Sequence, residues 1–121
     1  MKAVFEIKQA SDGRFVFNLK AANGQVVLTS QLYESKANAE AGIDSVKQNA
    51  GSKENYEEKT GNDGLPYFVL NAANRQVIGR SQMYSTRDAM LKGIASVKHN
   101  AKSAGTEDLT AQAGAAGGGA E

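Results

Sequence analysis

The stretch GIDSVKQNA at residues 42–50 recurs as GIASVKHNA at residues 93–101. Around it, residues 5–50 align with residues 56–101 without a gap, and 21 of the 46 aligned positions are identical. Such self-similarity indicates a duplicated structural unit. A unit of this size buries too small a fraction of its surface to fold readily alone. We therefore expect the two copies to share one core, related by pseudo-twofold symmetry like the subunits of a fused dimer.

Three strands are predicted at the start of each copy. In the first copy, residues 3–9 and 14–21 alternate between apolar and polar side chains, as half-buried strands do. The Asn-Gly pair that ends at Gly24 predicts a tight hairpin turn before a third strand over residues 25–31. In the second copy Arg75 replaces this glycine, so we expect Arg75 at positive φ.

A helix is predicted to follow each set of strands. Residues 36–50 carry apolar side chains at helical spacing, and Ser35 before them suits a helix N-cap. Gly42 and Gly93 fall in mid-helix on this apolar stripe, where glycine costs about 1 kcal/mol relative to alanine. We interpret both glycines as points of close packing that leave no room for a methyl group.

The composition favours a soluble globular protein. Hydrophobic residues make up 40% of the chain and charged residues 22%, and the net charge of +1 gives little attraction to nucleic acid or an anionic membrane. The absence of cysteine excludes disulfides, thiolate zinc sites and cysteine catalysis. No apolar run approaches the roughly 18 residues that span a bilayer. The first residues lack the apolar core of a signal peptide, so a cytoplasmic location is expected.

One domain is predicted over residues 1–101, with repeat 1 at residues 3–50 and repeat 2 at residues 54–101. We expect this internal pseudo-dimer to be a monomer. Residues 102–121 hold 11 alanines or glycines in 20 positions. Such a segment buries too little apolar surface to offset its ordering entropy, so we predict a disordered tail.

The paired motifs F-x-L-x-A-A-N-x-Q-V, S-Q-x-Y and G-I-x-S-V-K-x-N-A resemble the YegP-like family of small bacterial proteins, over about residues 3–101. The resemblance implies an α+β fold of tandem β-β-β-α repeats. It further implies one six-stranded, antiparallel-rich sheet, curved as a half-barrel, with two packed helices. Relatives with a single copy are expected to form the same object as a homodimer. The family has no established biochemical activity, so the resemblance implies a fold and no function.

Catalytic signals are weak. His99 is the only histidine, its counterpart in the first copy is Gln48, and it falls on the polar side of the predicted helix. Ser45 and Ser96 recur in both copies without a histidine or lysine pattern beside them. No metal-ligand spacing or phosphate-loop motif occurs. We predict no catalytic residue, cofactor or metal site, and a small-molecule enzyme without a recognisable motif is the third hypothesis.

Six duplicated polar residues, where the third strand of each copy leads to the helix, are candidates for a ligand groove. They are Ser30, Gln31, Tyr33, Ser81, Gln82 and Tyr84. Alternatively, each tyrosine packs on the first turn of the helix as a hydrophobic staple. The edges of an open sheet could also accept a strand from a partner.

A second set of residues is expected to point outward from the sheet: Arg14, Lys20, Tyr67 and Arg80. A basic surface with an aromatic ring favours single-stranded nucleic acid, although such recognition usually uses several aromatic rings. The first hypothesis is therefore a non-enzymatic binding or interaction module for an unknown ligand or protein partner. A weak single-stranded nucleic-acid binder is the alternative.

Overall fold

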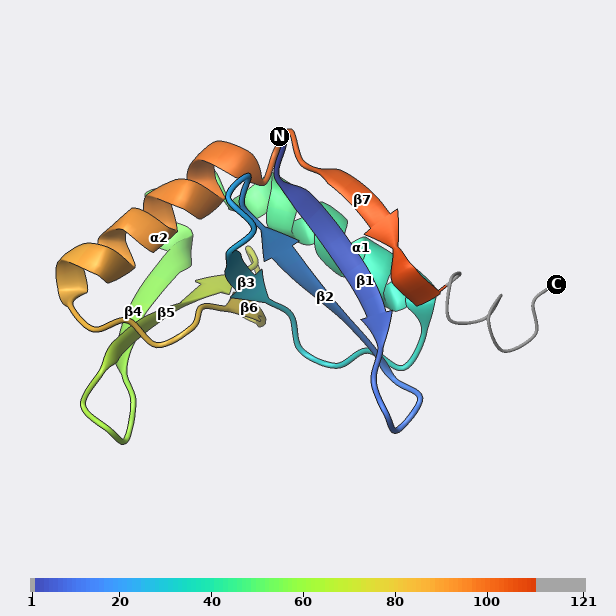
Figure 1. Cartoon of the computed structure of the whole chain (residues 1–121), viewed down its shortest axis with the longest axis horizontal. Coiled ribbons are helices and arrows are strands. Elements are labelled where there is room, and N and C mark those ends of the chain that lie inside the picture. The colour runs from blue at the N-terminus through green and yellow to red at the C-terminus, as the bar shows by residue number, and fades with distance from the viewer. Residues whose placement is uncertain (1, 111–121) are drawn as a thin grey trace, which may run out of the picture.

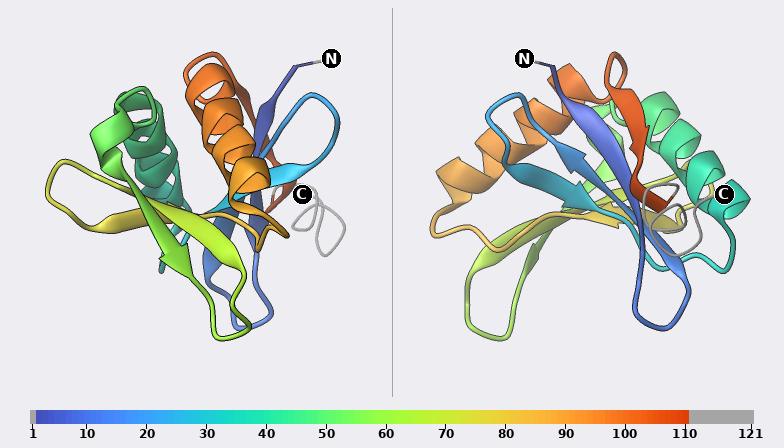
Figure 2. Two further views of the ribbon diagram at one scale, coloured as in Figure 1. Left: turned by 90° about the vertical axis from the view of Figure 1, so that its left-hand side faces the viewer. Right: turned by 45° about the vertical axis from the view of Figure 1, so that its right-hand side comes forward.

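A computed structural model describes residues 2–110 as an α+β fold in which two helices lie on the same side of one sheet (Figures 1 and 2). Repeat 1 forms β1 (Val4–Gln9), β2 (Phe15–Lys20), β3 (Val26–Thr29) and α1 (Lys36–Asn49). A short 3-10 helix, η1 (Lys53–Asn55), leads into repeat 2. Repeat 2 forms β4 (Tyr56–Thr60), β5 (Pro66–Asn71), β6 (Val77–Arg80) and α2 (Arg87–Asn100). A further strand, β7 (Gly105–Asp108), follows.

The seven strands form an open sheet in the order β4-β5-β6-β3-β2-β1-β7. The three strands of each repeat follow one another outward from a central antiparallel contact between β3 and β6, where Thr29 pairs with Arg80. All neighbouring strands are antiparallel except β7, which is parallel to β1. Each hairpin, β1–β2 and β4–β5, projects its turn away from the helices (Figure 1). The curvature of a half-barrel stays a prediction.

The alternation predicted for the first two strands is confirmed. Phe5 and Ile7 on β1 lie opposite Leu19 and Phe17 on β2, and all four side chains are fully buried in the core. The polar residues between them face the other side of the sheet. Period-two patterning alone therefore identifies the face of the sheet that the helices cover.

The predicted local signals for the helix start and the second hairpin turn are also confirmed. The Ser35 side chain accepts a hydrogen bond from the Asn38 amide at 3.1 Å, and Thr86 does the same for Ala89 at the start of α2. Arg75 adopts a φ of 73°, as its place in the former Asn-Gly turn predicts. Within residues 2–110, neither helix is long and apolar enough to cross a membrane.

Close packing at the mid-helix glycine of α1 is confirmed. The Tyr33 ring stacks on Phe17, with ring centroids 6.1 Å apart and planes 11° apart. Its hydroxyl lies against Gly42, and a Cβ added at Gly42 would stand 2.8 Å from Tyr33 Cζ and 3.0 Å from Phe17 Cε2. At these distances an alanine at position 42 would displace the Tyr33 or Phe17 ring. Glycine therefore allows the helix to pack directly against Tyr33.

The same arrangement recurs in the second repeat. Tyr84 stacks on Phe68 at 6.4 Å, and its hydroxyl lies against Gly93 of α2. A Cβ at Gly93 would stand 2.7 Å from Tyr84 Cζ. The repeated motif therefore holds each helix against an aromatic pair of its own repeat.

The centre of the sheet departs from the symmetry. Leu28 on β3 is fully buried, whereas its counterpart on β6 is Gly79. An added Cβ at Gly79 would lie 2.7 Å from both Cγ and Cδ2 of Leu28. One leucine therefore fills the space beside the junction that two leucines would have to share.

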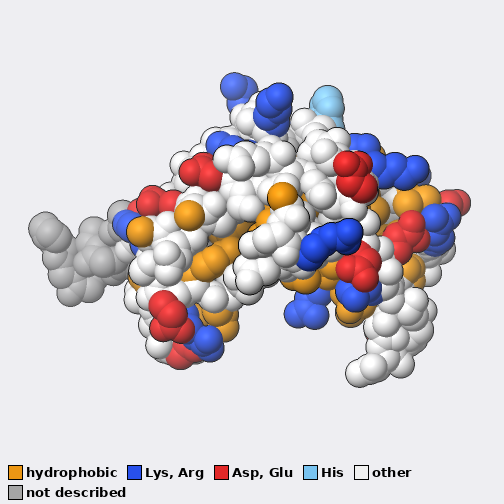
Figure 3. Space-filling model, turned by 180° about the vertical axis from the view of Figure 1, so that it is seen from behind, with side chains coloured by type: hydrophobic (Ala, Val, Ile, Leu, Met, Phe, Trp, Pro, Cys, Tyr) orange, Lys and Arg blue, Asp and Glu red, His pale blue; other side chains and the backbone are white. Residues whose placement is uncertain are grey.

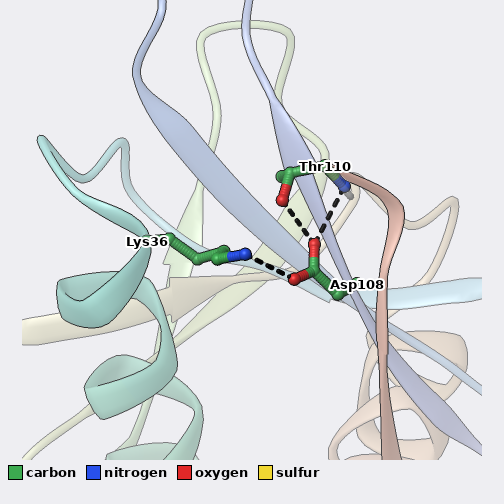
Figure 4. Close-up of polar contacts among 3 residues, drawn as sticks. All are labelled: Lys36, Asp108 and Thr110. Atoms are coloured by element: carbon green, nitrogen blue, oxygen red, sulfur yellow. Dashed lines mark hydrogen bonds and ion pairs between the residues drawn. The ribbon is translucent and has the colours of Figure 1, made fainter. Parts of the chain in front are cut away.

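Two predictions about the end of the domain are wrong. The sheet has seven strands where six were predicted, and residues 102–110, predicted as part of a disordered tail, include β7. The strand has no apolar alternation and is held by pairing with β1 and by polar contacts. Lys36 Nζ on α1 lies 2.7 Å from Asp108 Oδ2, and the Thr110 amide donates to Asp108 Oδ1 at 2.9 Å (Figure 4). The rest of the predicted tail, residues 111–121, lies outside the described residues.

Gly42→Ala is expected to lower the free energy of unfolding. Overpacking costs about 1–3 kcal/mol, which exceeds the roughly 1 kcal/mol that alanine gains over glycine in a helix. Chemical denaturation measures the difference, with Gly51→Ala as the control because an added Cβ there meets nothing within 4 Å. Tyr33→Phe removes the clashing hydroxyl and should restore part of the loss. A Gly42→Ala chain at least as stable as the unmodified one would contradict the packing account.

Gly79→Leu is expected to destabilise the fold by about 3 kcal/mol, because the new side chain would overlap Leu28. Exchanging the two residues, with Leu28→Gly and Gly79→Leu together, keeps one leucine at the junction. The exchanged chain should therefore regain most of the stability in thermal and chemical denaturation. The interpretation fails if the single substitution is tolerated, or if the exchange is no more stable than the single variant.

Candidate functional site

A hollow of about 590 Å³ lies over the junction of β3 and β6. Phe68 and Leu70 of β5 are buried on the helix side, so Tyr67 and Val69, which alternate with them, face the opposite side and line the hollow. We name this hollow the junction groove. Its lining is Val26, Thr29, Ser30, Gln31, Lys59, Tyr67, Val69, Val77, Gly79, Arg80, Ser81 and Gln82.

Both repeats contribute to the junction groove, but unequally. Three pairs of identical residues at equivalent positions line it: Val26 with Val77, Ser30 with Ser81, and Gln31 with Gln82. Other positions differ between the repeats. Arg80 is the counterpart of Thr29, and Tyr67 is the counterpart of Val16. The ring and the cations of the groove therefore come from repeat 2 alone.

Lys59 and Arg80 are the only charged residues in the described lining. Lys59 Nζ lies 3.4 Å from Glu57 Oε2, and hydrogen bonding from Asn71, together with Lys59, lowers the pKa of the Glu57 carboxyl. Arg80 is exposed and forms no ion pair within residues 2–110. Around these cations lie the valines and the Tyr67 ring, so the groove joins an apolar wall to a positive charge.

The serine hydroxyls of the predicted ligand groove are engaged within the fold. Ser30 Oγ accepts a hydrogen bond from the Phe17 amide at 2.9 Å and donates to the Gln31 carbonyl at 2.7 Å. Ser81 makes the equivalent pair of bonds in repeat 2. These hydroxyls therefore fasten the end of the third strand to the middle of the second strand.

The six predicted groove residues are divided by the structure. Ser30 and Ser81, with the exposed Gln31 and Gln82, lie together in the lining of the junction groove. Tyr33 and Tyr84 lie outside that lining and pack against the helix glycines instead. A ligand-binding role for the six residues stays a prediction.

Burial also affects the two tyrosines. Desolvation raises the pKa of the Tyr33 and Tyr84 hydroxyls above the usual value, and the nearby Gln31 and Gln82 side chains offset part of the rise. Both phenols therefore stay neutral at physiological pH. Neutral hydroxyls that pack against the helix glycines are consistent with a structural role for both tyrosines.

Several lining residues carry no signal in the sequence for a ligand groove. They lie outside the duplicated polar motif S-Q-x-Y and are Val26, Lys59, Val69 and Val77. Strand alternation places Tyr67 and Arg80 outward, but no local signal shows that β3 and β6 lie side by side. The groove exists only because that long-range pairing brings the two repeats together.

The four residues predicted as a nucleic-acid surface do not form one patch. Arg14 is paired with Asp12 at 2.7 Å beside the β1–β2 turn, and its hydrogen bond lowers the pKa of the Asp12 carboxyl. Lys20 pairs with Glu6 across the strands at 3.5 Å. Only Tyr67 and Arg80 come together, in the junction groove.

On the face seen in Figure 3, basic and acidic side chains are interspersed around a band of exposed hydrophobic side chains. His99 is exposed, as its place on the polar side of the helix predicts. Ser45 and Ser96 each contact the asparagine four residues later. In the part of the chain that the structure describes, no three His, Asp or Glu residues are placed to hold a metal ion.

Comparison with known proteins places the chain in a family. Residues 10–57 and 62–108 each match the family described as Domain of unknown function (DUF1508). UPF0339 protein YegP of Escherichia coli K12 is 51% identical over 110 residues, which cover 91% of this chain and 100% of that protein. UPF0339 protein MS1092 of Mannheimia succiniciproducens is 51% identical over 106 residues, which cover 88% of this chain and 94% of that protein.

Solved structures give the same assignment. The solution NMR structure of UPF0339 protein SO3888 from Shewanella oneidensis has a TM-score of 0.84 at 44% identity, covering 90% of this chain and 92% of that one. The solution NMR structure of E. coli yegP, described as a protein of unknown function, also has a TM-score of 0.84, at 51% identity, covering 89% of this chain and 93% of that one. This chain therefore belongs to the YegP-like DUF1508 family, whose function is unknown, and it carries the family's repeat twice.

Proposed function

We propose that this protein is a non-enzymatic binding module, and that the junction groove takes a small ligand with an apolar body and an anionic group. The observation that carries the proposal is the pairing of an apolar wall with two cations in one hollow of about 590 Å³. Sites for small molecules commonly have volumes of about 300–1,000 Å³ and a few polar groups within an apolar lining. The junction groove meets both criteria.

The position of Arg80 supports an anionic ligand. Its guanidinium has no carboxylate partner within residues 2–110, and the Tyr67 ring belongs to the same lining. A planar guanidinium binds carboxylate or phosphate through two parallel hydrogen bonds. Gln31 and Gln82, one from each repeat, add amide groups that can orient the ligand.

The lining also supports binding without catalysis. Its described residues include no carboxylate and no histidine, and both serine hydroxyls are engaged in the fold. Histidine and carboxylate groups are the commonest general acids and bases in enzymes. The described lining offers recognition groups without either of them.

Amide chemical shifts of the full chain test the proposal. Phenylacetate and adenosine monophosphate both join an anion to a flat apolar ring and serve as probes. Binding should shift the amide signals of β3, β5 and β6. Arg80→Gln should weaken binding about tenfold, since hydrogen bonds to charged groups are worth about 1.5–3 kcal/mol.

Arg14→Gln is the matched control, because it removes the same charge from the β1–β2 turn and should leave affinity unchanged. A short single-stranded oligouridine is the competing probe. Tighter binding of the oligouridine than of both small anions, with a steep loss of affinity as salt rises, would favour the nucleic-acid alternative. Absence of shifts with either small anion at about 10 mM, far above the affinity range of specific sites, would overturn the proposal.

A further inference from the structure

The two ends of the sheet differ, although the repeats that form them are equivalent. At one end, β1 is covered by β7 in a parallel register that runs from Val4 opposite Gly105 to Ile7 opposite Asp108. At the other end, β4 has β5 on one side and no strand on its outer side within residues 2–110. Figure 1 shows β7 alongside β1 and no corresponding strand beside β4.

Equivalent positions at the two ends differ in burial. Phe5 of β1 is fully buried, whereas its counterpart Tyr56 on β4 is partly exposed. Ile43 on α1 is 3% exposed, whereas its counterpart Ile94 on α2 is only half-buried. Leu91, one turn before Ile94, is 36% exposed. The repeat 2 end therefore leaves more apolar surface uncovered than the repeat 1 end does.

A groove of about 220 Å³ lies between β4 and α2 at this uncovered end. We name it the β4 groove. Tyr56, Leu91 and Ile94 supply its apolar surface. Strand β7 shows what suits the equivalent place in repeat 1, since it pairs with β1 and is tied to α1 by the Lys36–Asp108 ion pair (Figure 4).

We propose that the β4 groove binds an extended peptide segment of a partner protein, which adds as a strand parallel to β4 as β7 adds to β1. This inference is independent of the junction groove. That groove is lined by Lys59, whereas the β4 groove is lined by its neighbour Glu58, and successive strand residues face opposite sides of the sheet. Strand addition to an open edge is a general mode of peptide recognition.

The charges around the β4 groove specify an acidic segment. Glu58 is already bound by Arg87, whose Nε and Nη2 lie 2.8 Å and 3.0 Å from its carboxylate oxygens. Lys53 and Lys98 also line the groove, and neither forms an ion pair within residues 2–110. Lys53 precedes β4, so a parallel segment would begin beside it. We expect an acidic residue at the start of the segment and small or apolar residues after it.

A second copy of this chain is a poor occupant. Each chain has two equivalent edges, β1 and β4, but only one β7 among the strands of residues 2–110. Moving β7 of one copy onto β4 of another would uncover as much edge as it covers. Pairing β4 with β4 would bring together the exposed Glu57 and Glu58 of both copies, and edge strands rich in charge resist such pairing.

A peptide of this chain's own residues 103–110, SAGTEDLT, is the probe, because its sequence already suits the equivalent edge. Transferring the β7 register to repeat 2 places peptide positions 106–108 opposite residues 56–58 of β4, and position 103 then precedes the ladder on the side of η1, which contains Lys53. Two acetylated versions, Ser103→Glu and Ser103→Lys, are titrated into the full isotope-labelled chain. The Glu version should bind with a Kd on the order of 100 µM, which corresponds to a binding free energy of about −5.5 kcal/mol. It should shift the amide signals of β4 and α2.

Charge exchange gives the sharper readout. The Glu version should bind about fivefold more tightly than the Lys version, as expected for partly exposed ion pairs. Lys98→Glu in the protein should abolish this preference, because the new carboxylate would offset the charge of Lys53, which lines the same groove. Lys92→Glu is the matched control, because Lys92 is on the same helix, is exposed and does not line the groove. Of the Thr106→Pro and Glu107→Pro peptides, the one whose replaced amide faces β4 should lose binding, because proline removes that donor from the ladder, whereas the other replaced amide would face solvent.

Three results would overturn the proposal. The first is absence of binding by the Glu version at about 1 mM, a concentration that reveals even weak complexes. The second is a set of shifts at β1 in place of β4, which would mean that the peptide only displaces β7. The third is a dimer in sedimentation experiments whose formation blocks the peptide, which would make a second copy the occupant.

Discussion

The contact between β3 and β6 is the interaction on which the rest of the structure depends. It is short, with Thr29 paired to Arg80, and it is the place where the two repeats join into one sheet. On one face Leu28 lies over Gly79 and closes the shared core. On the other face the same strands form the floor of the junction groove. The shared part of the core and the groove are two sides of one pairing, so both depend on the contact between the repeats.

Much of the fold could be predicted because its signals are local. The burial of Phe5 and Ile7 follows from alternation along a single strand, and the Ser35 cap follows from the residues beside it. Gly42 required one further step, since a glycine on the apolar stripe of a helix indicates a close neighbour. The sequence did not reveal that this neighbour is the Tyr33 hydroxyl, because the contact depends on how the helix returns over the sheet.

The features that escaped prediction depend on pairing between distant segments. Strand β7 has neither apolar alternation nor β-branched residues in number, and its position is determined by the free edge of β1 and by Lys36 on α1. The composition of a segment indicates how much apolar surface it can bury. It does not indicate that β1, at the other end of the chain, has a free edge with which the segment can form backbone hydrogen bonds. Tyr67 and Arg80 were likewise expected on the surface, but their meeting with Val26 and Gln31 in one groove required the β3–β6 pairing.

The single leucine beside the central pairing also constrains how this protein can evolve. An assembly of identical one-repeat chains must place the same residue at both equivalent positions, giving two leucines in one space or two glycines and a void. In a chain that carries both repeats the two positions are free to differ, and the equivalent positions hold Leu28 in one repeat and Gly79 in the other. Neither half is suited to assemble with a copy of itself. Separation of the two halves into independent genes would therefore require compensating changes at this point, which makes the duplication difficult to reverse.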